Sequence, residues 1–254
     1  MMNIIVCVKA VPGFIQNPEV SEAGDRVEYE AGSIVINESD DYALEAAVKL
    51  AKDTGGKTKV ITVGSLSSQK VLQAGLAKGA DSAVRIDANL FDPTITSRVL
   101  ASAVKNYDYD LIMTGVESRD VMAAQVGISL AELLGLPFAY AVVEVEKGQK
   151  ENTVRITKEL GFGKKQIEEI DLPALVCFQT STEPVSFVPF RKMMMAQRKP
   201  IETVAMKSLE LEDLSPAVRI IDIFSPREMS HAEMIEGTPP EQARKLMTMI
   251  KEVI

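Results

Sequence analysis

The sequence predicts an α/β fold with a mostly parallel, doubly wound sheet, and three observations carry this prediction. Residues 3–8 form a continuous apolar run, which is typical of a strand that helices cover on both faces. Strand-like and helical segments then alternate as far as residue 137, the pattern of βαβ units joined by right-handed crossovers. Two of the predicted strands end at turns that contain glycine, at Val63-Gly64 and at Thr114-Gly115.

The first half of the chain follows this alternation element by element. Residues 14–36 carry short β-branched patches between glycines and predict a small hairpin. Ser39 or Asp40 is the expected N-cap of a helix over residues 41–52, whose apolar side chains recur at helical spacing. The other expected elements are strands over residues 59–63, 82–86 and 111–114 and helices over residues 67–77 and 93–105.

After residue 138 the pattern changes to short β segments separated by polar turns. Such segments predict antiparallel strands that are added to the sheet. The expected strands cover residues 140–146, 153–158, 165–170 and 174–178. Beyond residue 180 the periodicity weakens, apart from one amphipathic helix over residues 240–254. We therefore expect a C-terminal extended arm that lies on this domain or on another chain.

Composition excludes several classes of function. The chain has 254 residues, 46% hydrophobic and 25% charged, a balance typical of globular proteins. A net charge of −8 argues against nucleic acid as a partner, since phosphate binding needs a concentrated positive surface. No apolar run is long enough to cross a bilayer and no signal-peptide pattern opens the chain, so we expect a cytoplasmic protein without membrane insertion. A single histidine, His231, and the lack of a Cys/His cluster predict no metal site.

The stretch from residue 111 to residue 137 has the pattern of an anion-binding site. A buried strand leads into a loop opened by Gly115, and a helix is expected from about Ala123 to Leu134. The free N–H groups at residues 124–127 would then face a ligand, and the helix dipole favours negative charge there. Small residues allow a phosphate to approach the backbone closely, and here they are Ala123, Ala124 and Gly127.

Three segments are expected to meet at one edge of the sheet. Cys7 to Ala10, Val63-Gly64 and Thr114-Gly115 each follow a predicted parallel strand, and the carboxyl ends of such strands share an edge where ligands bind. Many α/β domains have such a loop without a ligand, so a purely structural loop is the alternative at this point. Cys7 and Cys177 lie in apolar runs and are expected to be buried thiols.

Four motifs, in order along the chain, resemble the β subunit of electron transfer flavoproteins. They are VCVKAVP at residues 6–12, ESDDYALEAAVKL after Asn37, GLAKGADSAVRI at residues 75–86 and GVESRDVMAAQVGISLAELLGLP at residues 115–137. The match covers about residues 2–145, and EPVSFVPFRKMMMAQRKPI matches more loosely. The resemblance implies an adenine nucleotide alpha hydrolase-like sheet and a heterodimer with an α subunit.

The resemblance also implies roles for individual residues. Cys7, Lys9 and Ala10 would lie beside the adenine, residues 37–40 near the ribose, and residues 115–127 around the phosphates. For Asn37 and Asp40 the alternative is a role as helix caps alone. The implied cofactor-binding residues are Cys7, Lys9, Ala10, Asn37, Asp40, Val63, Gly64, Gly115, Val116, Glu117, Ser118, Arg119, Asp120, Ala123, Ala124, Gln125, Val126 and Gly127.

The identity of the nucleotide depends on residues that depart from the family pattern. Many members carry acidic residues and an Asn before the loop's Gln and a Thr after it, whereas Met122, Ala124 and Val126 stand here. Members that bind a second FAD in place of AMP often have Val at that place, so the resemblance favours FAD in this subunit, with AMP as the alternative. With FAD it implies electron bifurcation from NADH, and with AMP a structural nucleotide in a single-flavin shuttle.

The resemblance implies a two-part organisation: an α/β nucleotide-binding domain, residues 1–180, and a recognition loop with a C-terminal arm packing on the partner subunit, residues 181–254. The loop would dock an acyl-CoA dehydrogenase or another redox partner, and the chain would transfer electrons as a subunit, with NADH oxidation only in the αβ complex. A stand-alone adenine-nucleotide-binding protein or hydrolase is the other class, although no GxxxxGK[ST] motif is present. The expected partner-binding residues are Val188, Phe190, Arg191 and Met194.

Overall fold

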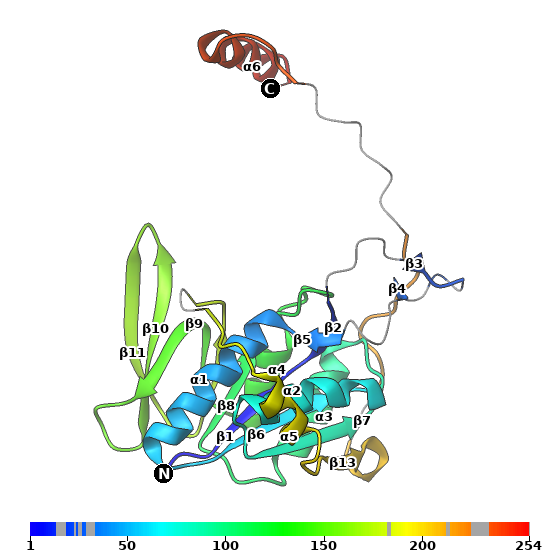
Figure 1. Ribbon diagram of the computed structural model, residues 1–254, viewed down its shortest axis with the longest axis vertical. Helices are drawn as coiled ribbons and strands as arrows, with labels where there is room; N and C mark the ends of the chain where they lie inside the picture. Colours follow the sequence, from blue (N-terminus) through cyan, green and yellow to red (C-terminus); the bar gives the residue numbers. More distant parts are fainter. Residues whose placement is uncertain are drawn as a thin grey trace.

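The computed structural model describes residues 1–13, 19–22, 24, 27–28, 34–181, 184–211, 214–224 and 234–253. Nine strands of this described part form one sheet in the order β11-β10-β9-β12-β8-β1-β6-β7-β13. The seven strands from β9 to β13 in this order are parallel, and β10 and β11 add an antiparallel hairpin at one end (Figure 1). The predicted α/β class with a mostly parallel sheet and added antiparallel strands is confirmed.

The central strands are short and buried, as their apolar runs predict. Each side chain of β1 is buried, and so are those of β12. The strands of the sheet are β1 (Ile4–Cys7), β6 (Thr58–Val63), β7 (Ser82–Asp87), β8 (Leu111–Gly115), β9 (Phe138–Lys147), β10 (Thr153–Gly161), β11 (Lys164–Asp171), β12 (Ala174–Phe178) and β13 (Glu202–Ala205).

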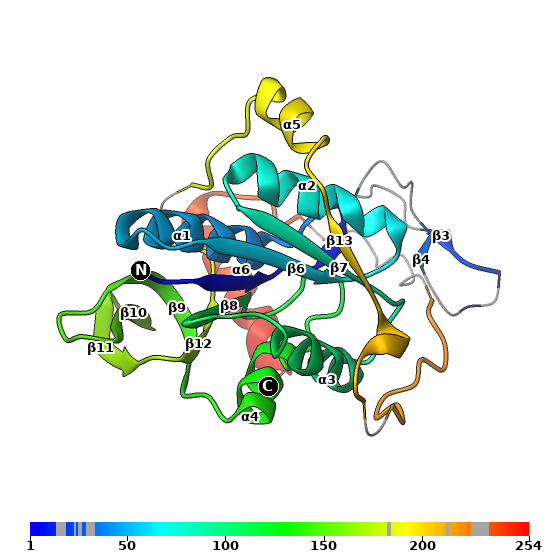
Figure 2. The ribbon, with the colours of Figure 1, turned by 90° about the horizontal axis from the view of Figure 1, so that it is seen from below.

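Helices cover both faces of the sheet, which makes it doubly wound (Figure 2). On one face α1 (Glu38–Thr54), α2 (Gln69–Lys78) and α5 (Phe190–Ala196) enclose one apolar cluster. On the other face α3 (Pro93–Val104) and α4 (Val126–Leu134) enclose a second. The sheet therefore separates two apolar cores.

One strand prediction is corrected by the pairing. The expected antiparallel strand over residues 174–178 is β12, which lies parallel to both β8 and β9. Its side chains are all buried because it lies inside the sheet, and an uninterrupted apolar run marks such a position in either orientation. Only β9, β10 and β11 form the expected antiparallel meander.

The start of α1 is also corrected. The helix begins at Glu38, with Asn37 as the N-cap, rather than at residue 41 after a Ser39 or Asp40 cap. Acidic residues favour the first turn because of the helix dipole, and this turn carries three. The side chain of Asp40 instead bonds Gly115 at the end of β8, and that of Ser39 bonds Glu117 in the loop that follows.

The single hairpin expected within residues 14–36 is replaced by two separate antiparallel strand pairs. β3 (Glu19–Val20) pairs with β4 (Val27–Glu28), whereas β5 (Ile34–Ile36) pairs with β2 (Ala10–Pro12). Residues 14–18, 23, 25–26 and 29–33 of that expected hairpin lie outside the described residues, as does His231.

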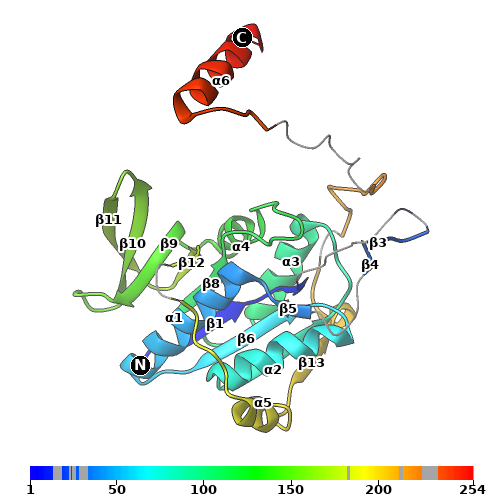
Figure 3. The ribbon, with the colours of Figure 1, turned by 45° about the horizontal axis from the view of Figure 1, so that its top comes forward.

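The chain beyond residue 180 returns to the sheet before it leaves the domain. Helix α5 packs against α2, and β13 pairs with β7 at the sheet edge, so the α/β domain extends to about residue 205. The 3-10 helix η3 (Met206–Ser208) follows. The amphipathic helix expected at the C-terminus is α6 (Pro239–Val253), which stands apart from the sheet domain (Figures 1 and 3).

We predict that Leu44→Ala lowers the free energy of unfolding by about 2–5 kcal/mol, because Leu44 is fully buried between α1 and the sheet. Leu160→Ala is the matched control, since that side chain is 58% exposed on β10 and should change stability by less than about 0.5 kcal/mol. Urea unfolding followed by far-ultraviolet circular dichroism measures both variants. Equal losses in the two variants would contradict the core assignment.

Candidate functional site

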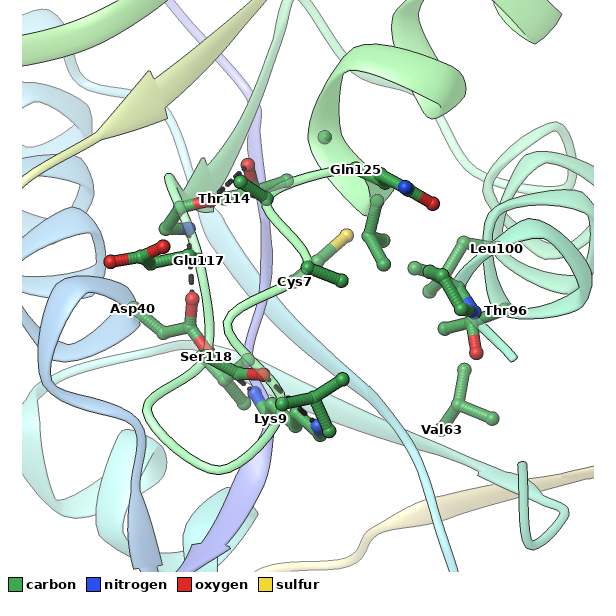
Figure 4. Close-up of a pocket in the computed structure, with 18 of the residues that line it drawn as sticks. Cys7, Lys9, Asp40, Val63, Thr96, Leu100, Thr114, Glu117, Ser118 and Gln125 are labelled. Carbon is green, nitrogen blue, oxygen red and sulfur yellow. Dashed lines mark hydrogen bonds between the residues drawn. The ribbon is translucent and has the colours of Figure 1, made fainter. Parts of the chain in front are cut away.

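A pocket lies at the carboxyl ends of β1, β6 and β8, where the sequence predicts it (Figure 4). The loop between β8 and α4 forms one wall, and α3 with the loop before it forms the other. The residues that line it are Cys7, Val8, Lys9, Asp40, Ile61, Val63, Leu90, Phe91, Pro93, Thr96, Leu100, Thr114, Gly115, Val116, Glu117, Ser118, Val121, Ala123, Ala124, Gln125, Val126 and Gly127.

Asp40 joins the ends of two neighbouring strands. Its Oδ2 accepts the N–H of Lys9 at 2.7 Å, and its Oδ1 accepts the N–H of Gly115 at 2.8 Å. The side chain is buried, 6% exposed, so both bonds form away from water. A Cβ on Gly115 would collide with Asp40 and Ser39, so only glycine permits this approach. The carboxylate thereby fixes the spacing between β1 and the loop that follows β8.

Asn37 and Ser39 hold the same loop two residues further on. The Nδ2 of Asn37 donates to the carbonyl oxygen of Glu117 at 2.7 Å, and the hydroxyl of Ser39 donates to that oxygen at 2.8 Å. The Oδ1 of Asn37 accepts the N–H of Arg119 at 3.0 Å. Asn37 is only 2% exposed and supports the loop from behind, so it does not line the pocket.

Lys9 closes the loop from the pocket side. Its ammonium group donates to the hydroxyl of Ser118 at 3.0 Å and to the carboxylate of Asp120 at 2.8 Å. The main chain of Lys9 is also engaged, since its N–H bonds Asp40 and its carbonyl accepts the N–H of Asn37. Both main-chain groups of Lys9 therefore have protein partners, and any base in the pocket meets this residue chiefly through its side chain.

Helix α4 begins later than expected, which moves the predicted anion site. Gln125 is the N-cap and Val126 the first helical residue, three positions beyond Ala123. Met122 and Ala124 have positive φ angles of 52° and 53°, so the chain turns sharply there and cannot continue a helix. No side chain caps this terminus, and the first free N–H groups belong to residues 126–128.

Gly127 has a different role from the one expected. A Cβ on Gly127 would lie 2.5 Å from the Sγ of Cys177 and 2.6 Å from the Oγ1 of Thr114. Those atoms belong to β12 and β8, so the glycine allows the first turn of α4 to pack on the sheet. The close approach that the sequence suggests is thus between helix and sheet, and a larger residue would displace the helix from β8 and β12.

The wall formed by α3 and by the loop between β7 and α3 is missing from the sequence prediction. Leu90, Phe91, Pro93, Thr96 and Leu100 face the pocket from this side. Figure 4 shows Cys7 in the middle, with Thr96 and Leu100 across the open space from it. β7 is parallel to β6, so the carboxyl-edge argument applied to the strand over residues 82–86 would have included this loop.

Five of the predicted cofactor-binding residues do not line the pocket: Ala10, Asn37, Gly64, Arg119 and Asp120. Ala10 belongs to β2, and Gly64 accepts a bond from the guanidinium of Arg85 at 2.9 Å through its carbonyl oxygen. Arg119 and Asp120 are exposed at the outer end of the loop. Their contacts shape the turns around the pocket.

The electrostatics of the pocket floor follow from burial. Burial, together with the nearby Asp40 and Cys177, raises the pKa of the Cys7 thiol to about 12, so Cys7 stays a neutral thiol. Both cysteines are free and buried, as expected. Burial also raises the pKa of Asp40 to about 7, against the opposing effect of the N–H groups of Lys9 and Gly115.

The expected partner-binding residues lie on the opposite helical layer from α3 and α4, before and within α5. Phe190 is 78% exposed, Arg191 and Met194 are exposed, and Val188 is half-buried against the α1–α2 core. Glu45 of α1 accepts the N–H of Ser186 at 2.9 Å and so anchors the segment that leads to α5.

Among the residues that the structure describes, no helix has both the length and the apolar character needed to span a membrane. No group of three or more His, Cys, Asp and Glu side chains in the described ranges is placed to hold a metal ion.

The geometry defines an α/β protein whose pocket combines apolar walls with an uncapped helix terminus, a combination suited to an organic anion. A family model described as the electron transfer flavoprotein domain matches residues 28–209. A protein of Methylophilus methylotrophus named electron transfer flavoprotein subunit beta is 33% identical, over 99% of this chain and 98% of its own length. The chain therefore belongs to the electron transfer flavoprotein family, as a beta subunit.

Two other relatives have the same extent. The electron transfer flavoprotein subunit beta of Bacillus subtilis is 28% identical over 98% of both chains. A protein of Anaerotignum propionicum named acryloyl-CoA reductase electron transfer subunit gamma is 27% identical over 99% of this chain and 98% of its own length. The similarity thus includes the segment beyond the sheet as well as the pocket.

We predict that the stability of the wild-type protein falls as pH rises from about 4 to about 7 because of Asp40. The folded state holds this proton more tightly than the unfolded chain, where the ordinary pKa is 3.8, so the stabilisation is complete below about pH 4 and is lost through about pH 7. The slope is up to about 1.4 kcal/mol per pH unit. Asp40→Asn should remove this component.

Urea unfolding of both proteins across that pH range measures the slope. Asp53→Asn, an exposed carboxylate on α1, is the control for loss of one charge. Identical pH slopes for wild type and Asp40→Asn would show that Asp40 does not titrate in this interval.

Proposed function

We propose that this chain binds an adenine nucleotide, FAD in preference to AMP, in the pocket between the β8–α4 loop and α3. It works as one half of a heterodimer with an α subunit and transfers electrons between a donor, such as NADH or a dehydrogenase, and acceptor redox proteins. The single observation that carries the proposal is the uncapped N-terminus of α4 facing an apolar pocket at the carboxyl edge of the sheet.

The residues present suit such a ligand. The N–H groups at the start of α4 are free donors for phosphate oxygens, and the helix dipole adds positive potential at the same place. Leu90, Phe91 and Leu100 offer apolar surface for a flat ring system. The strained turn at Met122 and Ala124 aims the helix terminus at the pocket, and such strain is common at ligand sites.

Charge favours a pyrophosphate over a terminal phosphate. Among the described residues that line the pocket, Lys9 is the only cation, and its ammonium already bonds Ser118 and Asp120. Val126 stands at the first helical position and has no hydroxyl to donate to a terminal phosphate oxygen. A monophosphate carries its negative charge on one phosphorus, whereas FAD spreads it over two, so fewer donors are needed at each.

Bound flavin would supply the redox chemistry, and this chain would supply position and electrostatics. The clamp made by Asn37, Ser39 and Asp40 keeps the loop in one conformation, and the neutral thiol of Cys7 adds no charge beside the ring system. With FAD in both subunits the heterodimer holds the two flavins that bifurcation of electrons from NADH requires. With AMP here, the nucleotide is structural and transfer passes through a single flavin.

Nucleotide content tests the proposal directly. The chain is co-expressed with its α subunit, the complex is denatured, and FAD and AMP are quantified per heterodimer by chromatography. We expect two FAD and no AMP. One FAD and one AMP would keep the site and change the ligand, and one FAD alone would contradict the proposal.

Val126→Asp introduces a carboxylate at the place where the phosphates of the nucleotide are proposed to bind. We expect the nucleotide of this subunit to be lost while the heterodimer still forms, because a carboxylate in the first turn stabilises the helix by about 0.3–1 kcal/mol but repels phosphate. Val126→Asn is the neutral control of the same size and should keep the nucleotide. Retention by Val126→Asp would place the phosphates elsewhere.

We propose further that Phe190 anchors the acceptor protein, since it is an exposed aromatic side chain beside Arg191 and Met194. Phe190→Ala should slow electron transfer to the acceptor acyl-CoA dehydrogenase at least roughly tenfold, while the flavin content stays unchanged. Phe162→Ala, at the exposed turn between β10 and β11, is the control. A normal rate for Phe190→Ala would remove α5 from the docking surface.

A further inference from the structure

Asp92 lies in the pocket wall but does not face the pocket. It stands between Phe91 and Pro93, both of which line the pocket, at the point where the chain leaves β7 and enters α3. Its side chain is buried, 4% exposed. The position of this residue therefore sets the position of the apolar wall.

The two oxygens of Asp92 have separate partners. Oδ1 accepts the N–H of Thr94 at 2.7 Å and that of Ile95 at 3.3 Å, which caps α3. Oδ2 accepts the N–H of Val218 at 2.8 Å, and the N–H of Ala217 also bonds this carboxylate. One side chain thus joins the start of α3 to a segment more than a hundred residues later in the chain.

Capping alone does not require a carboxylate, since Asn and Ser cap helices as well as Asp. What a carboxylate adds is acceptors on both sides of the group, while an amide has one acceptor and one donor. The arrangement at Asp92 uses both oxygens as acceptors. The negative charge also strengthens each of these bonds.

The segment that Asp92 holds is the strap, which we define as residues 214–224. It follows Leu209 and Leu211, which pack against the α3–α4 core, and it leads towards the small β3–β4 sheet (Figure 2), where the N–H of Ile223 donates to Gly24 at 2.9 Å. The side chains of the strap are largely exposed. Main-chain bonds therefore contribute much of its attachment, and the bond to Asp92 is one of them.

The strap is also the route from the domain to α6. That helix stands apart from the sheet domain and carries exposed apolar side chains, among them Leu246 and Met247 (Figure 3). The bond between Val218 and Asp92 is therefore a physical connection between this arm and the pocket wall at Phe91 and Pro93.

We propose that Asp92 is a positioning residue that couples the C-terminal arm to the nucleotide pocket, an inference that rests on the proposed nucleotide binding. When the strap is seated, the carboxylate fixes the β7–α3 loop and the wall is closed against the ligand. When the strap is released, the loop relaxes and the nucleotide leaves faster. Seating of the arm and retention of the nucleotide then stabilise each other, as linkage requires.

Two substitutions disrupt the hydrogen bond between Asp92 and Val218, one at the acceptor and one at the donor. Asp92→Asn keeps an oxygen for the N–H groups of Thr94 and Ile95 but turns an N–H₂ group towards Val218. Val218→Pro removes one of the two strap N–H groups that bond Asp92 and leaves Asp92 itself unchanged. Val218→Ala, which keeps the N–H, and Asp53→Asn, an exposed carboxylate on α1, are the matched controls.

Two measurements are made on each purified αβ heterodimer. The first is the rate of trypsin cleavage after Arg219, which reports whether the strap is attached. The second is the FAD and AMP retained per heterodimer over time in dialysis, which reports release of the nucleotide beyond the one FAD of the α subunit. Size-exclusion chromatography selects assembled heterodimer before both.

We expect both variants to be cleaved faster and to release this nucleotide roughly five- to tenfold faster, with the controls unchanged. The double variant should be no worse than Asp92→Asn alone, because that substitution already removes the bond to Val218. Faster cleavage with unchanged release would overturn the coupling while leaving the proposed function standing. A wild-type heterodimer with no nucleotide in this subunit would overturn both.

Discussion

The rest of the site depends on one buried carboxylate that two strand ends share. Asp40 accepts the N–H of Lys9 after β1 and the N–H of Gly115 at the end of β8, and it does so from the first turn of α1. A buried carboxylate needs such donors because desolvation alone would be costly. Adjacent Asn37 and Ser39 extend the contact along the loop. One helical turn therefore sets the shape of the loop that leads to α4.

The shape of this loop determines where helix α4 begins. The turn at Met122 and Ala124 delays the helix to Val126, and Gly127 lets its first turn lie against Thr114 and Cys177 on the sheet. The free N–H groups then face a pocket whose opposite wall belongs to the β7–α3 loop. The clamp and the wall are fixed by different carboxylates, Asp40 and Asp92, and each bonds main-chain N–H groups from distant parts of the chain.

The first part of the segment beyond residue 180 completes the sheet domain. β13 pairs with β7 and occupies the edge of the sheet, which would otherwise present unpaired backbone groups. α5 packs on α2 and leaves Phe190 and its neighbours exposed on the opposite face from α3 and α4. The proposed acceptor surface and the proposed nucleotide pocket are thus built on opposite helical layers of one sheet. Their separation allows the two functions to be tested by independent substitutions.

The amino-acid sequence is enough to predict the α/β class, the strand and helix order up to residue 178 and the edge at which the pocket forms, because these follow from local periodicity and from the geometry of parallel strands. Two features depend on contacts that only the folded chain makes. They are the orientation of β12, whose buried run fits either direction, and the start of α4, which follows a turn at Met122 and Ala124. The pocket wall at Phe91 and the hydrogen bond between Asp92 and Val218 could likewise be found only in the tertiary structure. Contacts between residues far apart in the chain leave no periodic signal, so no local pattern predicts them.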